Sequence, residues 1–285
     1  MLQIIHGIAE HVARYDDFAK FLNGLGYVVV AEDHMGHGKS VNGDGVQGYF
    51  HGGWHTAVDD SYELLRRTKL EYPGIPYVLF GHSMGSFMTR TILCRYPQSG
   101  ITAAVICGTG WQPRQLLPPA IGICEAVCKK IGEQNKSDLL QNLIFGSYNR
   151  KVEHPRTPYD WLTRDARIVD QYVADPLCGF VPSCGLLREL LKGIAYIENP
   201  KHLAAMNKEL PILLIAGGDD PVGSYGKGVT QTAKAFRQAG MQDVSQKLYP
   251  LGRHEILNEI NREEVYQDVA SWLKKKLPPV ESQNN

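Results

Sequence analysis

The sequence predicts an α/β fold in which a mostly parallel sheet carries helices on both faces. Short apolar runs alternate with amphipathic helical segments along most of the chain, and this alternation is typical of such sheets. Some runs, such as residues 27–31, are continuously apolar, which indicates strands buried on both faces. A chain of 285 residues is long enough for one large domain of this kind with an insertion, or for two small domains.

Strand and helix patterns follow one another from the first residues to the last helix. Strands are expected at residues 2–5, 27–31, 77–80, 101–107, 211–216 and 246–249. Helices are expected at residues 16–25, 54–71, from 84 onward, 227–238 and after 261. The last helix is predicted to begin with a capping box formed by Asn261 and Glu264. It is expected to bury Val265, Val269 and Trp272.

The character of the chain changes after Gly110. Between about 111 and 205, helical stretches are interrupted by prolines and no clear strand pattern is present, which predicts a helical insertion with its own packing. We therefore divide the chain into a core of residues 1–110 and 206–277, an insertion of residues 111–205, and a flexible tail of residues 278–285.

Composition excludes several functional classes. Thirty basic and thirty acidic residues give no net charge, so a nucleic-acid partner is not expected. No apolar run is long enough to span a bilayer, and the first residues lack the features of a signal peptide. The six cysteines form no C-x-x-C pair, and we predict reduced, mostly buried thiols in a cytoplasmic protein. A disulfide between Cys178 and Cys184 is the less favoured alternative.

The stretch Gly81-His82-Ser83-Met84-Gly85 has the pattern G-x-S-x-G between an apolar run and a helical pattern. In this strand–turn–helix context, the pattern predicts a tight, strained turn that presents the Ser83 hydroxyl as a nucleophile. Gly81 and Gly85 are expected because side chains at those positions would collide with the neighbouring strand and helix. We interpret His82 as a structural hydrogen-bonding residue rather than a base.

Ser83, Asp220 and His254 each follow a predicted strand, so we expect them to meet at the carboxyl edge of the sheet. A histidine can remove the serine proton, and a buried carboxylate can hold the imidazole in the useful tautomer. We assign Ser83 as nucleophile, His254 as base and then acid, and Asp220 as the residue that orients His254. Asp219 remains a competing candidate for the carboxylate. The order serine, acid, histidine is that of the α/β-hydrolases.

Two backbone N–H groups are predicted to form an oxyanion hole, those of Met84 and of Ile8. This chemistry requires no metal and no cofactor, and we predict neither. Two histidine pairs, His6 with His11 and His34 with His37, lack a third ligand in the sequence, and we interpret them as structural. Asp33 is interpreted as a turn anchor whose carboxylate accepts backbone hydrogen bonds.

Four stretches together resemble the monoacylglycerol lipase and bacterial lysophospholipase family, a serine aminopeptidase-like branch of the α/β-hydrolases. They are His6-Gly7-Ile8-Ala9-Glu10-His11 with Arg14-Tyr15, Asp33-His34-Met35-Gly36-His37-Gly38-Lys39-Ser40, Gly81-His82-Ser83-Met84-Gly85 and Gly252-Arg253-His254-Glu255. Residues 145–149 and 159–162 resemble the lid of bacterial members. The resemblance extends from residue 4 to about residue 275.

The resemblance implies an α/β-hydrolase fold whose insertion, residues 111–205, is a lid over the active site. It places Ser83, Asp220 and His254 at the catalytic positions and Ile8 and Met84 at the oxyanion hole. It implies small-molecule or lipid ester substrates, such as monoacylglycerols or lysophospholipids, and transient contact of the lid with membranes or micelles.

The chain departs from the family pattern in two ways. Ser86 stands where the family usually has a second glycine, and we expect its hydroxymethyl group either to reduce the room beside the turn or to add a hydrogen bond. The family normally has two further strands before residues 2–5, so residues 27–31 would lie at an edge of the sheet. An apolar edge invites pairing with another chain, and we hypothesise a homodimer through this edge or its coverage by the lid or tail.

Hydrolysis of acyl esters through an acyl-enzyme is the leading function, and two alternatives remain. A peptidase of the same fold that trims N-terminal residues would need an acidic patch for the substrate amine. A ligand-binding protein with low turnover would keep the fold and the pocket. Candidate acids for the patch are Glu125, Glu133, Glu153 and Asp160. Candidate residues for an apolar tunnel, of which we interpret most as lid core, are Trp111, Leu116, Leu117, Ile121, Ile123, Phe145, Tyr148 and Trp161.

Overall fold

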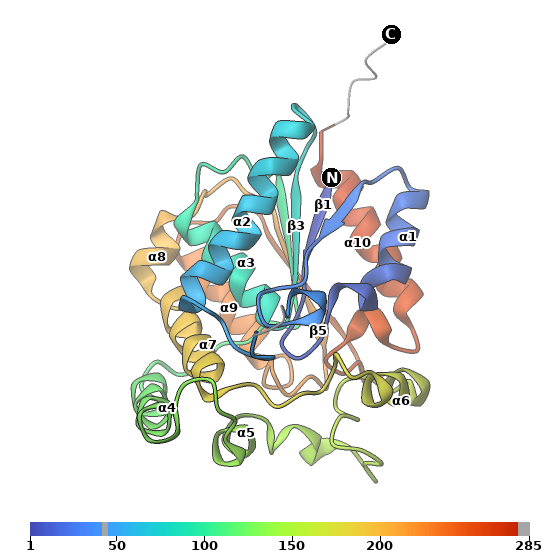
Figure 1. Cartoon of the computed structure of the whole chain (residues 1–285). Helices are drawn as coiled ribbons and strands as arrows, with labels where there is room; N and C mark the ends of the chain where they lie inside the picture. Colours follow the sequence, from blue (N-terminus) through green and yellow to red (C-terminus); the bar gives the residue numbers. More distant parts are fainter. Residues whose placement is uncertain (42–44, 279–285) are drawn as a thin grey trace.

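The computed structural model describes residues 1–41 and 45–278 and has the predicted α/β fold (Figure 1). Within these residues, an all-parallel sheet of six strands has the order β2-β1-β3-β4-β5-β6. The strands are β1 (Leu2–Ile5), β2 (Val29–Ala31), β3 (Val78–His82), β4 (Ala103–Cys107), β5 (Ile212–Gly217) and β6 (Val244–Tyr249). Every predicted strand is present, and the predicted ends differ from the observed ends by at most two residues.

Helices connect these strands and agree closely with the sequence patterns. The α-helices are α1 (Asp16–Gly24), α2 (Gly53–Glu71), α3 (Met84–Arg95), α4 (Leu117–Ile131), α5 (Asp138–Phe145), α6 (Ala166–Ala174), α7 (Cys184–Ile197), α8 (Pro200–Ala205), α9 (Lys227–Gln238) and α10 (Arg262–Lys276). Short 3-10 helices are η1 (Val12–Tyr15), η2 (Gly38–Ser40), η3 (Tyr148–Lys151) and η4 (Ile256–Asn258).

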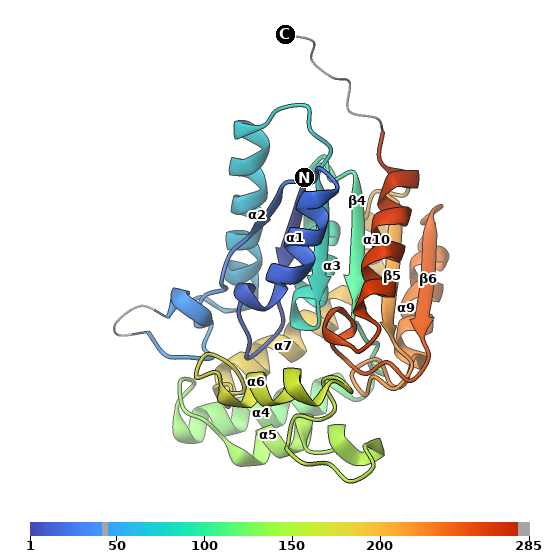
Figure 2. The same cartoon turned by 90° about the vertical axis from the view of Figure 1, so that its right-hand side faces the viewer.

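The helices cover both faces of the sheet (Figures 1 and 2). Successive strand residues point to opposite faces, so Leu79 packs in the cluster that includes α2, α3 and α9, whereas Phe80 packs in the cluster that includes α1 and α10. The two clusters hold the strands between them. This arrangement fixes the carboxyl ends of the strands, from which the polar loops emerge.

The strand β2 lies at the edge of the sheet, as the resemblance implied. The prediction that residues 27–31 are buried on both faces was wrong, because Val29 and Val30 are only half-buried and Ala31 is exposed. A strand with a neighbour on one side only is shielded less than a central strand. The exposed side chains next to it include Leu25 and Val28.

The last helix, α10, confirms the predicted core residues but not the predicted capping box. Val265, Val269 and Trp272 are buried. Asn261 is the N-cap residue, but its side chain caps no backbone N–H group. It donates instead to the Glu264 carboxylate at 3.0 Å. The pair is therefore a contact between two side chains rather than a reciprocal cap.

The insertion, residues 111–205, contains α4 to α8 and no strand, and in the described chain its only β contact is an isolated bridge between Lys136 and Ser183. Its two ends differ in packing. Buried residues of α7 and α8 belong to the same hydrophobic cluster as α2 and α3, whereas α4, α5 and α6 lie across the carboxyl ends of the strands (Figure 2). The division into core, lid and tail stays a proposal, and residues 279–285 of the tail lie outside the described residues.

Two further observations concern the whole chain. All six cysteines are free and buried, so the alternative of a disulfide between Cys178 and Cys184 is not realised. Among the helices of the described chain, none combines the length and the apolar character needed to cross a membrane.

Candidate active site

Ser83 occupies the sharp turn between β3 and α3, with φ 54° and ψ −121°. A positive φ is costly for a residue with a side chain, so the predicted strain is present. A Cβ on Gly81 would collide with Thr89 and with the Gly85 carbonyl, and a Cβ on Gly85 would collide with the Ile5 carbonyl. Both glycines are therefore required by the neighbouring backbone, as predicted.

Behind the turn, Ser86 adds the hydrogen bond that was one of the two expected effects of its hydroxymethyl group. Its hydroxyl donates to the Ser83 carbonyl at 2.6 Å. Ser86 is fully buried, so this bond also satisfies a hydroxyl that would otherwise lack a partner inside the protein.

The structure brings His254 and Asp220 together in a buried pair. The Nδ1 atom of His254 lies 2.9 Å from Oδ2 of Asp220. Oδ1 of Asp220 accepts the Val222 N–H at 2.8 Å, so both carboxylate oxygens are engaged. Asp219, the competing candidate, is exposed, and in the described structure its carboxylate accepts no hydrogen bond. The geometry therefore favours Asp220 over Asp219 as the partner of His254.

The Asp220 carboxylate changes the acidity of His254. Burial by itself lowers the pKa of His254, but the charge of Asp220 and its hydrogen bond outweigh burial, and the pKa is raised above its usual value of 6.5. Because Nδ1 faces Asp220, Nε2 is the ring nitrogen left for a proton from another group.

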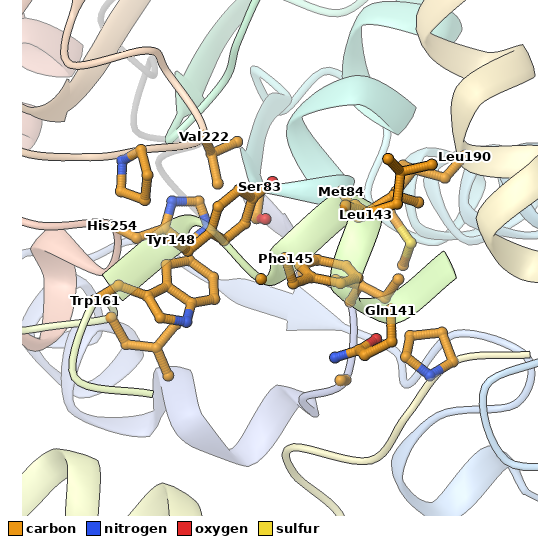
Figure 3. Close-up of a pocket in the computed structure, with 18 of the residues that line it drawn as sticks. Ser83, Met84, Gln141, Leu143, Phe145, Tyr148, Trp161, Leu190, Val222 and His254 are labelled. Atoms are coloured by element: carbon orange, nitrogen blue, oxygen red, sulfur yellow. The ribbon is translucent and has the colours of Figure 1, made fainter. Parts of the chain in front are cut away.

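Ser83 and His254 line the same cavity, which has a volume of about 620 Å³ (Figure 3). Among the described residues, the Ser83 hydroxyl forms no hydrogen bond with the His254 ring. Such bonds are commonly long in unliganded enzymes and tighten when substrate binds. The predicted nucleophile and the histidine of the buried pair thus face the same cavity.

The loop after β1 passes directly beside Ser83. A Cβ on Gly7 would lie 3.1 Å from the Ser83 Cβ. The Gly7 N–H donates to Oε1 of Glu10 at 2.5 Å, which fixes the turn of the loop. In the described chain the N–H groups of Ile8 and Met84 have no protein acceptor, and both residues line the cavity. Two free donors are thus available near Ser83.

A charged network that sequence reasoning did not assign supports this loop. Arg14 donates to both carboxylate oxygens of Glu255 at 2.5 and 2.6 Å and to Glu10 at 2.8 Å. Burial favours neutral Glu255, but Arg14 outweighs it and lowers the pKa of Glu255 to about 2. Burial also raises the pKa of Glu10, and Arg14 offsets this only in part. Glu10, Arg14 and Glu255 all lie in the stretches that carried the family resemblance, which is the signal that could have identified them.

Two other interpretations of single residues have different outcomes. Asp33 is a turn anchor, as predicted, because its carboxylate accepts the Val12 and Lys39 N–H groups at 2.8 Å each. The hydrogen-bonding part of the His82 interpretation was wrong, because its ring makes no hydrogen bond among the described residues, whereas its structural role rather than that of a base stays a prediction. Instead it packs 4.7 Å from the His254 ring, centroid to centroid, and burial lowers its pKa well below 6.5.

The paired histidines pack in the loops beside the site. The His34 N–H donates to Nε2 of His6 at 3.0 Å, and the two rings stack. Burial lowers the pKa of His34 to about 3 and that of His37 to about 4, so both rings are neutral at physiological pH. These contacts support the structural interpretation of His6, His34 and His37.

His11 differs from the other three histidines. Its Nε2 lies 2.8 Å from Asp175, and Cys178 is also close, so that one ligand atom from each residue lies within 4.8 Å of the others. The sequence offered no third ligand for the pair His6 and His11; folding places two ligand-type side chains of the insertion, Asp175 and Cys178, beside His11, and His6 is not part of this group. The absence of a metal stays a prediction.

The cavity wall shows which of the candidate tunnel residues of the insertion face the cavity. Leu116, Leu117, Phe145, Tyr148 and Trp161 line the cavity, whereas Trp111, Ile121 and Ile123 do not, so the interpretation of most of them as lid core was wrong. Figure 3 shows Tyr148 and Trp161 beside His254, with Leu143, Phe145, Met84 and Leu190 extending away from Ser83. The cavity is predominantly apolar along this second part.

The candidate acids for a peptidase do not reach the cavity. Glu125, Glu133, Glu153 and Asp160 do not line it. Glu133 pairs with Arg188 at 2.5 Å, and Asp160 accepts the Thr157 N–H at 2.6 Å. Of the described residues, the carboxylates that line the cavity are Glu10 and Glu255, and Arg14 binds both.

Comparisons with known proteins place the chain in a family of hydrolases. The family described as serine aminopeptidase, S33, matches residues 1–261. A monoacylglycerol lipase of Mycolicibacterium smegmatis is 29% identical over 275 residues, which cover 95% of this chain and 86% of the relative. The monoglyceride lipase of Homo sapiens is 27% identical and covers 97% of this chain, with 82% of the relative matched.

A solved structure is similar over almost the whole chain. A highly thermostable carboxyl esterase from Bacillus coagulans, in complex with glycerol, is 30% identical with a TM-score of 0.89, and the match covers 96% of this chain and 89% of that one. The chain is therefore a hydrolase of the esterase and lipase type with the α/β-hydrolase fold. It belongs to the serine aminopeptidase S33 family.

Proposed function

We propose that the protein hydrolyses acyl esters through an acyl-enzyme on Ser83, with His254 as the base and Asp220 as the residue that orients it. The observation that carries this proposal is the buried His254–Asp220 pair, whose histidine lines the same cavity as the strained Ser83. The relatives named as a monoacylglycerol lipase and a monoglyceride lipase, and the structurally similar esterase, support it.

In the proposed mechanism, the Ser83 oxygen attacks the carbonyl carbon of the ester while its proton passes to Nε2 of His254. The Asp220 carboxylate stabilises the resulting imidazolium at Nδ1. The carbonyl oxygen becomes an oxyanion, and the free N–H groups of Ile8 and Met84 donate to it. Each such donor is worth on the order of 3 kcal/mol in the transition state.

Collapse of this intermediate breaks the ester C–O bond. The leaving alcohol takes the proton from His254, and the acyl group remains on Ser83. A water molecule then repeats the sequence: it gives a proton to His254, adds to the acyl carbon and releases the carboxylic acid, and Ser83 regains its proton. Proton and electron pair balance in each half, so no cofactor is needed.

We further propose monoacylglycerols, lysophospholipids or similar lipid-like esters as substrates. The apolar part of the cavity, lined by Phe145, Leu143 and Leu190, can hold an acyl chain. The outer surface of the insertion carries exposed apolar side chains, which supports transient contact with a membrane or micelle. They include Ile123 and Leu139, which do not line the cavity, and Leu116 and Leu143, which line it and are also largely exposed.

The two alternative functions have less support. An aminopeptidase needs a free carboxylate for the substrate amine, and Arg14 already binds both carboxylates of the cavity wall. A ligand-binding protein of low turnover would not need a strained Ser83 in a cavity that also contains two free N–H donors. Two smaller proposals remain, a homodimer through the apolar edge at β2 and a reducing, cytoplasmic location consistent with six free cysteines.

The test of the proposed function is the variant Ser83→Ala with p-nitrophenyl butyrate as substrate. We expect turnover to fall about a million-fold, as in serine hydrolases that lose the nucleophile. A fluorophosphonate probe should label the native protein and not the variant. Substantial hydrolysis by folded Ser83→Ala would refute the mechanism, and an aminoacyl anilide cleaved faster than an acyl ester would favour the peptidase.

A further inference from the structure

In a short part of the insertion, residues 160–165, every residue from 160 to 164 forms a hydrogen bond with the segment 253–261, which carries His254. We call these residues the strap. The Glu255 N–H donates to the Leu162 carbonyl at 2.7 Å, and the His254 N–H to the Trp161 carbonyl at 3.4 Å. The Arg253 guanidinium donates to the Asp160 and Thr163 carbonyls at 2.6 and 3.1 Å. The strap is therefore joined by several hydrogen bonds to the loop that carries His254.

One buried carboxylate joins the two segments. Glu259 has no exposed surface. Its Oε1 accepts the backbone N–H groups of Arg164 at 3.1 Å and Arg253 at 2.9 Å. Its Oε2 accepts Nε of Arg164 at 2.9 Å and the Ile260 N–H at 3.1 Å. All four partners are donors, so both oxygens must be acceptors, and only a carboxylate meets this requirement.

The strap also forms part of the catalytic cavity. The Trp161 ring lies 5.1 Å from the His254 ring and 4.7 Å from the Tyr148 ring, centroid to centroid. Because Trp161 rests against His254, any displacement of the strap would move the wall behind the imidazole. The same displacement would release the backbone of His254 and Glu255.

The helix α5 of the insertion contrasts with the strap. In the described structure, no hydrogen bond joins residues 138–145 to the core segments 1–110 and 206–277, and Leu139 and Leu143 are largely exposed. The insertion thus contains a segment fixed to the core and a segment held mainly by its own packing.

We propose that the strap is a fixed wall of the active site and that Glu259 is a positioning residue, which holds His254 in place through Arg164, Arg253 and Trp161. This inference rests on the proposed role of His254 as the catalytic base. Glu259 does not reach the cavity itself, so it acts on the reaction only through the segments that it joins.

The variant Glu259→Gln tests the proposal. The amide NH₂ of the glutamine would face two N–H donors, so the donors that now bind one oxygen of Glu259 would lose their acceptor. We expect kcat to fall about a hundredfold with little change in KM, since small displacements of a catalytic group are costly. The acidic limb of the kcat/KM profile should move to lower pH, because a His254 held less firmly against Asp220 loses part of the increase in its pKa.

Hydrogen exchange gives a readout that does not depend on activity. In the native protein, the amides of His254 and Glu255 should exchange more slowly than exposed backbone of the insertion, and Glu259→Gln should accelerate both. The matched control is Glu263→Gln, an exposed residue in the first turn of α10, which should resemble the native protein in every measurement.

A second variant keeps the proposal testable if Glu259→Gln does not fold. Arg164→Gln removes the bonds from Nε to Glu259 and from Nη2 to Asn261 but leaves the buried carboxylate with backbone partners. We expect a kcat about tenfold lower, with the same shift of the acidic limb. Folded variants with native kcat, native pH profile and native exchange would overturn the inference. If Ser83→Ala instead retained activity, the proposed mechanism would fail, while the exchange data would still report on the strap.

Discussion

At the scale of single residues, the site depends on the hydrogen-bond partner of each polar atom. Asp220 uses one oxygen for His254 and the other for the Val222 N–H, so its carboxylate is held in one orientation. Asp219, the preceding residue, is exposed, and in the described structure its carboxylate accepts no hydrogen bond. Sequence spacing alone could not separate the two acids, because both follow β5 and only the fold decides which one turns inward.

The variant Asp220→Asn should retain the fold and lose about four orders of magnitude in kcat, since an amide favours the wrong tautomer of His254. Its residual activity should also have an acidic limb at lower pH. The base must be neutral to act, so activity rises as the pH passes the pKa of His254, and Asp220 is the group that raises this pKa.

Steady-state kinetics on a soluble ester between pH 5 and pH 9 would measure both effects. Asp219→Asn is the matched control and should behave like the native protein. A large loss in Asp219→Asn with native activity in Asp220→Asn would reverse the assignment.

At the scale of elements, the turn between β3 and α3 was predictable because its determinants lie within five neighbouring residues. The strands and helices were also predictable, since their apolar patterns are local. The network of Arg14 and Glu255 was not, because the two residues are 241 positions apart and only the sheet brings their loops together. The strap was missed for the same reason, and the burial of β2 was overestimated because a pattern does not reveal the neighbours of a strand.

The packing of α3 against β1 leads to a prediction for Gly85. A methyl group there would collide with the Ile5 carbonyl, a backbone atom that cannot move without displacing β1. Gly85→Ala should therefore lower the free energy of unfolding by at least about 3 kcal/mol. The control is Gly122→Ala in α4, where an added Cβ would meet no atom within 4 Å.

Chemical denaturation should show the control to be as stable as the native protein, or up to about 1 kcal/mol more stable, because alanine favours helix. Equal stability of Gly85→Ala and the native protein would mean that α3 can shift away from β1.

At the scale of the whole molecule, the insertion exposes several large apolar side chains to solvent, while other residues of it line the catalytic cavity. Ile123 and Leu139 are exposed and do not line the cavity, so replacing both with serine should leave hydrolysis of a soluble ester unchanged. Activity on micellar monoacylglycerol should fall several-fold, because less apolar surface is available to contact the micelle. Leu70→Ser, at an exposed position in α2, is the control and should leave both activities at the native level.

An ion-pair network also joins the loops that meet at the site, and it should make the stability of the protein depend on pH. Arg14 neutralises two buried carboxylates, those of Glu10 and Glu255. Arg14→Gln would leave them facing each other without a cation, so we expect a loss of about 3 to 5 kcal/mol in the free energy of unfolding near pH 7.

The difference in the free energy of unfolding between the native protein and Arg14→Gln should become smaller as the pH falls. The folded-state pKa of Glu255 is depressed to about 2 by Arg14, so the stability that this pair contributes is present above the unfolded value of 4.5 and is lost as the pH falls towards 2. The pKa of Glu10 is raised in the native protein, so folding favours its protonated carboxyl, and the contribution of Glu10 to stability increases as the pH falls.

Urea unfolding of the native protein and of Arg14→Gln from pH 7 to pH 2.5 would measure the difference in their free energies of unfolding. The control is Lys20→Gln, which removes an exposed ion pair with Asp16 and is expected to follow the native curve. A difference that does not vary with pH would show that Arg14 stabilises the loops by packing against Tyr172 rather than by its charge.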